Sequence, residues 1–145
     1  MIKVRDGRPG DADKICGYKL ESVRLNFPEC EFSDKMFRAH LLRQLRTDPE
    51  NVKVIEADGK VAGYIWLKIV ESTVGTFGRI EHVFVDRGFR NHGIGKRLML
   101  AAEDYFRGRG IKKVKLTVTA DNKAAVSLYR HMGFETRRYV MEKDL

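Results

Sequence analysis

The sequence lacks most features that mark secreted, membrane-spanning or metal-stapled proteins. It has two cysteines and three prolines among 145 residues, and Cys16 and Cys30 form no metal-ligand spacing with each other or with the histidines. We therefore expect free thiols and no metal site. The longest apolar run, Val61–Val70, is interrupted by Lys68 and is too short to cross a bilayer. The first residues lack the apolar segment of a signal peptide, which favours a cytoplasmic protein with no membrane partner.

Repeats, low-complexity tracts and Pro/Ser-rich linkers are absent too, so residues 1–145 are predicted to form one domain. Hydrophobic residues make up 43% of the chain, enough for a packed core. The formal net charge is +8. This favours an anionic partner and leaves open whether that is nucleic acid, a phosphorylated cofactor or an acidic surface.

Hydrophobic periodicity and turn signals predict alternating strands and helices. The expected strands are Ile2–Arg5, two runs on either side of the Asp58-Gly59 turn, Gly78–Val85, Val114–Val118 and the segment from Phe134 onward. Helices are expected after the N-cap candidates Asp11, Ser33 and Asn122, and from Ile94. The chain is thus a mixed α/β domain built around a sheet.

The segment Arg90–Leu98, RNHGIGKRL, resembles a phosphate-binding loop in composition. A P-loop ending at Gly95-Lys96 would require a glycine at Arg90 and a hydroxyl at Arg97, so that motif is excluded. A dinucleotide fingerprint would require glycine or alanine at Leu98. The remaining interpretations are an anion site at a helix N-terminus, where unpaired amides and a partial positive charge gather, and an ordinary glycine-containing loop with solvated charges.

A second motif follows this loop and decides between those two interpretations. Asn122–Phe134 reads NKAAVSLYRHMGF, after the strand-like LTV. Together with Arg90-x-x-Gly93-x-Gly95, it resembles the GCN5-related N-acetyltransferase (GNAT) family, whose signature is [RQ]-x-x-G-x-[GA] after the fourth strand and N-x-x-A-x-x-x-Y-x-x-x-G-F after the fifth. The opening IKVRDGRPGDADKI is also similar to the family's first strand and helix, so the resemblance covers essentially the whole chain.

The resemblance implies a GNAT fold of the α+β type: a mixed central sheet of six to seven strands, about four helices, and a splay between the fourth and fifth strands. It implies acetyl-CoA as the acetyl donor, with its pyrophosphate in the glycine loop and its pantetheine arm beside the fourth strand. The residues that it assigns to the cofactor are Phe84, Val85, Arg90, Asn91, His92, Gly93, Ile94, Gly95, Lys96 and Asn122.

Two residues match positions that carry the family's chemistry. Tyr129 corresponds to the usual general acid, and Glu81 corresponds to a position that takes the proton of the amine acceptor in several subfamilies. On a regular strand Glu81, Val83 and Val85 would share one face, and His82 would point to the opposite one. We therefore expect direct attack of an amine on the thioester, with Glu81 rather than His82 as the proton acceptor.

The acceptor is the least determined part of this prediction. Glu29 and Glu31, in the loop between the first two helices, are substrate-binding candidates that could attract a cationic amine, although an exposed polar loop is the simpler explanation for them. A homodimer is expected by family analogy. The alternatives are a CoA-binding GNAT domain without turnover and a basic nucleic-acid-binding module; the tract Arg107–Lys115 is basic but lacks aromatics for base stacking, so nucleic acid is not the expected partner.

Overall fold

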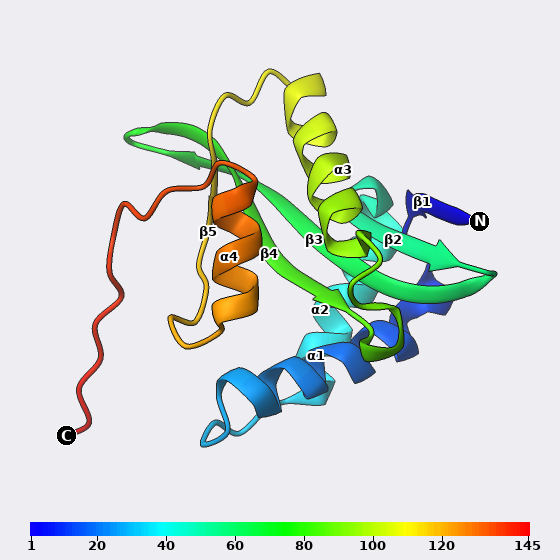
Figure 1. Ribbon diagram of the computed structural model, residues 1–145, viewed down its shortest axis with the longest axis horizontal. Helices are drawn as coiled ribbons and strands as arrows, with labels where there is room; N and C mark the ends of the chain where they lie inside the picture. Colours follow the sequence, from blue (N-terminus) through cyan, green and yellow to red (C-terminus); the bar gives the residue numbers. More distant parts are fainter.

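The computed structural model describes residues 1–145 as a five-stranded sheet with helices on both faces (Figure 1). The strands are β1 Ile2–Asp6, β2 Val52–Ala57, β3 Lys60–Ser72, β4 Gly75–Val85 and β5 Val114–Leu116. The helices are α1 Ala12–Asn26, α2 Asp34–Thr47, α3 Ile94–Gly108 and α4 Lys123–His131. None of the helices combines the length and the apolar character that a membrane-spanning segment requires.

The sheet has the strand order β1-β2-β3-β4-β5, with antiparallel pairs from β1 to β4. β5 is parallel to β4 and pairs with it only from Gly78 to Ile80. The β4 residues from Glu81 to Val85 therefore have no strand partner on this side. This divergence lies where a splay between the fourth and fifth strands was expected.

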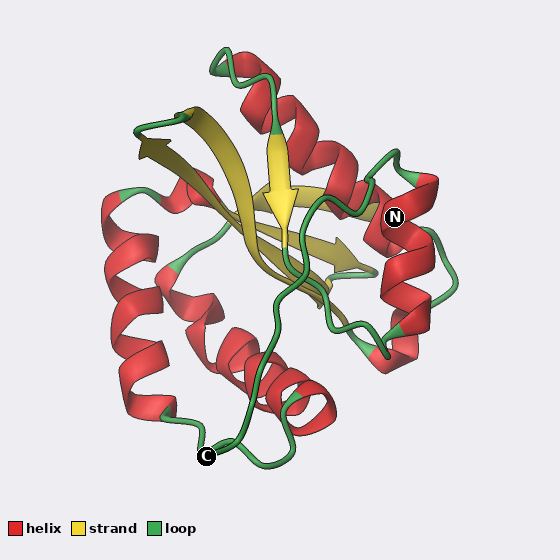
Figure 2. Ribbon diagram, turned by 90° about the vertical axis from the view of Figure 1, so that its left-hand side faces the viewer, coloured by secondary structure: helices red, strands yellow, loops and turns green.

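Each face of the sheet has its own hydrophobic core. On one face, α3 contributes Leu98, Met99 and Phe106 to a cluster that half-buried residues of α4 also contact. On the other face, α1 and α2 contribute Ile15 and Leu41 to a second cluster. Figure 2 shows this arrangement, with α1 and α2 on one side of the yellow strands and α3 and α4 on the other. Amphipathic helices on both faces bury a sheet that would otherwise expose apolar side chains.

Local sequence accounts for several boundaries. Asp58 and Gly59 have φ values of 53° and 77°, so the β2–β3 hairpin turn has the conformation that this dipeptide predicts. The Ser33 hydroxyl accepts a hydrogen bond from the Met36 amide and caps α2. Asp11 precedes α1 as predicted, but its carboxylate binds the guanidinium of Arg5 and the amide of Arg8 instead of capping the helix.

The prediction of six to seven strands is wrong, because the sheet has five. The segment Phe134–Leu145 forms no strand, and β5 ends at Leu116 instead of Val118. After Phe134 this segment is exposed, and its apolar residues Tyr139, Val140 and Met141 are consecutive. A half-buried strand requires alternation, so this pattern offers no apolar face with which to pack onto a sheet.

Candidate active site

The glycine loop connects the end of β4 to the start of α3. Asn91 and Gly93 both have left-handed backbone conformations, with φ values of 66° and 72°, and Gly93 is the residue just before the helix. The first α3 hydrogen bond runs from the Arg97 amide to the Gly93 carbonyl at 3.0 Å, and the amides from Asn91 to Lys96 make no hydrogen bond within the protein. The head of α3 thus presents a group of free N–H donors, the arrangement that binds anions at helix N-termini.

The side chains around this loop divide into two groups. His92 and Lys96 are exposed, so they can face an anion. Arg90 instead holds the loop: its Nε donates to the Val85 carbonyl at 3.1 Å, and its guanidinium lies 5.4 Å from the centre of the Phe84 ring. Ile94 is buried and anchors the helix in the core, so it can offer a ligand only its main chain.

Gly95 has a packing role that the motif alone does not reveal. A Cβ atom at this position would lie 3.2 Å from Cδ2 of Leu128 in α4, which is tighter than an ordinary contact. A Cβ at Gly93 would meet nothing within 4 Å. Of the two glycines in the motif, Gly93 therefore supplies the left-handed conformation, and Gly95 allows α3 and α4 to approach each other.

A β-bulge on β4 overturns our assignment of side-chain faces. Trp66 of β3 pairs with His82 and the next residue, Leu67, pairs with Ile80, so Glu81 is an extra residue without a partner. Such a residue breaks the strand's alternation. As a result Glu81 and His82 line one groove on the α2 side, whereas Val83 and Val85 pack against the α3 core. The expectation that Glu81 shares a face with Val83 and Val85 is wrong, whereas His82 lies on the face opposite these two valines, as expected.

His82 lies in an enclosed setting beside Glu81. Its ring centre is 5.7 Å from those of Phe37 and Trp66, in edge-on geometry, and its Nδ1 is 2.9 Å from Nζ of Lys19 in α1. Burial, with a smaller contribution from the Lys19 ammonium, lowers the pKa of His82 to about 4. Burial also lowers the pKa of Lys19. A neutral imidazole that accepts from Lys19 through Nδ1 carries its proton on Nε2, so it is poorly suited to take another proton near neutral pH.

The groove has a volume of about 500 Å³, which is in the size range of small-molecule sites. One wall comes from α2 and the other from β3 and β4. Its lining residues are Phe37, His40, Arg43, Gln44, Thr47, Asp48, Trp66, Lys68, Glu81 and His82. The contribution of Lys19, Phe37 and Trp66 could not be predicted from the sequence, because these residues come from three elements and no spacing in the sequence links them.

The two matched α4 residues occupy different environments. Asn122 caps α4: its side-chain oxygen accepts a hydrogen bond from the Ala125 amide at 3.2 Å. Tyr129 is half-buried, and its ring centre lies 6.0 Å from that of Phe134. Its hydroxyl makes no hydrogen bond to the protein, and no buried polar side-chain atom lacks a partner, so this hydroxyl reaches the surface. Burial raises the pKa of Tyr129 to about 12.

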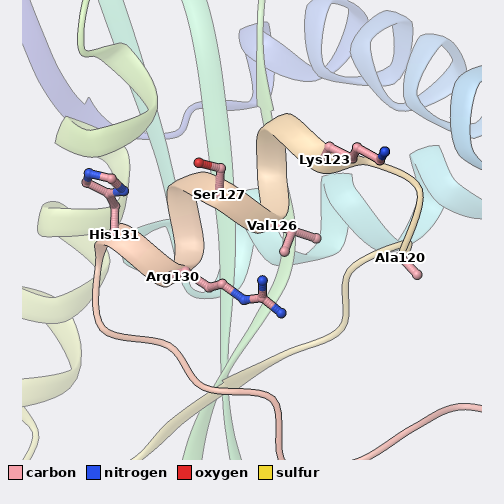
Figure 3. A pocket seen from close by; sticks show the side chains of 6 residues that line it. All are labelled: Ala120, Lys123, Val126, Ser127, Arg130 and His131. Carbon is pink, nitrogen blue, oxygen red and sulfur yellow. The ribbon is translucent and has the colours of Figure 1, made fainter.

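Two further surfaces contribute less to this picture. Glu29 and Glu31 are exposed in the α1–α2 loop, and neither forms an ion pair or lines the groove. A second pocket, of about 440 Å³, lies on the outer face of α4 between Ala120 and His131, and Figure 3 shows its lining side chains. Most of these residues are exposed, so the second pocket is an open surface feature.

Comparison with known proteins agrees with the motifs and the fold. Residues 18–134 match the acetyltransferase (GNAT) family. The chain is 38% identical over 142 residues to a mycothiol acetyltransferase of Saccharomonospora viridis, an alignment that covers 93% of this chain and 46% of the relative. It is 33% identical over 101 residues to an uncharacterized N-acetyltransferase of Methanocaldococcus jannaschii, with 66% of this chain and 44% of the relative covered. The chain thus spans less than half the length of these relatives.

A crystal structure of a GCN5-related N-acetyltransferase from Ralstonia eutropha has the same fold, with a TM-score of 0.82, 23% identity and 99% coverage of both chains. The family match covers most of the chain, and the two sequence motifs lie inside it. The chain therefore belongs to the GNAT acetyltransferase family, in which acetyl-CoA is the acetyl donor.

Proposed function

We propose that this chain transfers the acetyl group of acetyl-CoA to a primary amine by direct attack of the amine on the thioester. The observation that carries this proposal is the group of free amides at the head of α3, next to the unpaired end of β4. The amides from Asn91 to Lys96 would hold the pyrophosphate, and Phe84 and Val85 would offer main-chain partners to the pantetheine arm, as an open strand edge does. Asn122 precedes the first residue of α4 and matches the asparagine of the family motif. It is proposed to contact the same pantetheine arm.

Glu81 is the proposed proton acceptor. An amine with a pKa of about 10.4 is almost fully protonated at neutral pH, and removing its proton there costs about 4.6 kcal/mol. A carboxylate that lines the groove can take this proton as the C–N bond forms. The neighbouring His82 is less suitable, because its Nδ1 lies 2.9 Å from Nζ of Lys19 and is already occupied by that contact.

Tyr129 is proposed to act on the leaving group. Breaking the C–S bond places negative charge on sulfur, and the surface-accessible hydroxyl of Tyr129 can donate a hydrogen bond to it. The pKa of Tyr129 is about 12, above the value of about 8.5 for a thiol, so complete proton transfer from the phenol is uphill. We therefore assign to Tyr129 the stabilisation of the developing thiolate by a hydrogen bond.

A binding and turnover experiment tests this function. Calorimetry with acetyl-CoA and a thiol-release assay with a panel of amines are applied to the intact chain and to Lys96→Glu. Reversing an exposed charge at the α3 head should raise the KM for acetyl-CoA about tenfold, because the pyrophosphate then meets a carboxylate. The control is Lys112→Glu, the same charge change at an exposed lysine without an ion-pair partner. If Lys96→Glu binds acetyl-CoA as tightly as the intact chain does, the pyrophosphate does not bind at the head of α3.

A further inference from the structure

Three basic residues form one row across the sheet, beside the groove. Lys68 of β3 is directly opposite Arg79 of β4, and Arg79 is directly opposite Lys115 of β5. Residues that oppose one another in neighbouring strands project from the same face, with Cβ atoms about 5 Å apart. Lys68 lines the groove, so the row starts inside the groove and continues away from it along the α2-facing side of the sheet.

Such a row is unfavourable for the protein by itself, because like charges directly opposite each other repel. The structure compensates it only in part. Arg79 contacts Glu81 at 3.5 Å, and both side chains of this ion pair are partly exposed. The ring of Phe77 lies 5.7 Å from the guanidinium of Arg79 and 4.0 Å from Nζ of Lys115. Lys68 has no ion-pair partner, so the row keeps an excess of positive charge.

The opposite wall of the groove adds to this excess. Arg43 and His40 project from α2, and Asp48 at the end of that helix is the one carboxylate there. Across the groove and the row, the cations Arg43, Lys68, Arg79 and Lys115 face the carboxylates Asp48 and Glu81. The acceptor side therefore has a negative residue, Glu81, at the bulge and a positive surface directly beside it.

We propose that the acceptor is a small amine that also carries a carboxylate or phosphate group. This rests on the proposed acetyl transfer: the amine lies at Glu81 and the anionic group lies on the row of Lys68, Arg79 and Lys115. The weak ion pair of Glu81 with Arg79 marks the point where such a ligand enters, because the ligand's two charges replace the two charges of that pair. With about 5 Å between neighbouring strands, the amine and the anion of the ligand are about 5–10 Å apart.

This proposal differs from the sequence-based expectation of a cationic acceptor at Glu29 and Glu31. Those carboxylates are exposed in the α1–α2 loop and line no part of the groove. The charges that do border the groove next to Glu81 are mainly positive. A polycationic amine would bring additional positive charge against this surface, whereas an amine with one anionic group complements both charges.

Matched pairs of amines test the proposal. The kcat/KM values of 4-aminobutyrate and 4-aminobutyramide, and of O-phosphoethanolamine and ethanolamine, are measured by thiol release at saturating acetyl-CoA. The anionic member of each pair should be preferred by about tenfold or more, since it gains charge-assisted hydrogen bonds to the row. Lys68→Gln and Lys115→Gln should lower this preference, because each reduces the kcat/KM of the anionic member more than that of the neutral member. Lys112→Gln, at an exposed site outside the row, should keep the preference.

The outcomes separate this proposal from the proposed function. Thiol release with no preference, or with preference for the neutral member, would overturn the anionic acceptor and leave acetyl transfer standing. A preference that survives in both Lys68→Gln and Lys115→Gln would also overturn it, because the row would then not be its cause. If no amine of the panel releases thiol and calorimetry detects no acetyl-CoA binding, the proposed function itself is contradicted and the acceptor proposal falls with it.

Discussion

The donor side and the acceptor side of the candidate site are built from different chemical groups. At the head of α3, most of the groups that can face a ligand are main-chain amides, with the exposed side chains of His92 and Lys96 beside them, whereas Ile94 and Arg90 serve the core and the loop. In the groove, the groups are side chains from α2, β3 and β4. A main-chain site tolerates substitution wherever the backbone path is kept, whereas a side-chain site changes with each residue. We therefore expect the head of α3 to bind the donor that the family shares, and the groove to determine which acceptor is used.

The largest expected effect tests whether α4 belongs to the donor side. Tyr129→Phe removes the hydroxyl and keeps the ring that packs against Phe134. We expect kcat to fall about 10²–10³-fold, the usual loss when one hydrogen-bond donor to a developing anion is removed, with little change in the KM for acetyl-CoA. Steady-state kinetics at saturating amine measure this.

Tyr139→Phe is the matched control, because Tyr139 is 87% exposed and lies outside the motif. Unaltered kcat in Tyr129→Phe would leave Tyr129 as a packing residue only. A parallel fall in both variants would instead indicate a general effect of removing a phenol from this chain.

The next effect concerns the acceptor side and its half-buried His82. The pKa of His82 is about 4 in the folded chain and about 6.5 when unfolded, so between these pH values the unfolded chain binds the proton and the folded chain does not. The stability that His82 supports is present above about pH 6.5 and is lost as the pH falls toward 4. At about 1.36 kcal/mol per pH unit, the contribution of His82 to the free energy of unfolding falls by about 3 kcal/mol as the pH drops from about 6.5 to about 4.

His82→Phe isolates this contribution, because it keeps an aromatic ring between Phe37 and Trp66 and removes the titrating group. Urea unfolding of both chains between pH 4 and pH 7 gives the free energy of unfolding at each pH. The variant should lose less stability than the parent chain across this window. Parallel curves would mean that His82 titrates near its ordinary value and that the groove is wetter than its packing indicates.

The same contrast explains what could be predicted from the sequence. The α3 head was predictable because its determinants are local: glycines at fixed spacing follow an apolar strand, and the helix period begins at Ile94. The caps Ser33 and Asn122 and the Asp58-Gly59 turn were predictable for the same reason. Each depends on residues within a few positions of one another.

The acceptor groove was not predictable because its geometry depends on pairing between distant elements. The bulge at Glu81 exists only in the register between β3 and β4, and alternation along β4 by itself gives the wrong face for Glu81. The contact of Lys19 with His82 joins residues 63 positions apart. The prediction of a C-terminal strand was wrong for a related reason, because a short apolar run does not determine whether it will pair with the edge of a sheet.

The smallest effect asks whether Gly95 belongs to the donor site or to the core. Gly95→Ala gains helix propensity, about 0.5–1 kcal/mol, but its Cβ lies 3.2 Å from Leu128, so the net change in the free energy of unfolding should be near zero. Leu128→Ala relieves the contact. The free energy of unfolding of the double variant should therefore be about 1 kcal/mol higher than the sum of the two single effects predicts. Urea unfolding of the four chains measures this coupling, and calorimetry with acetyl-CoA is the second measurement. Coupling with unchanged affinity in Gly95→Ala makes Gly95 a helix-packing residue, so that the donor site depends on the free amides and on Gly93. Weaker acetyl-CoA binding in Gly95→Ala without coupling would instead mean that the missing side chain makes room for the ligand.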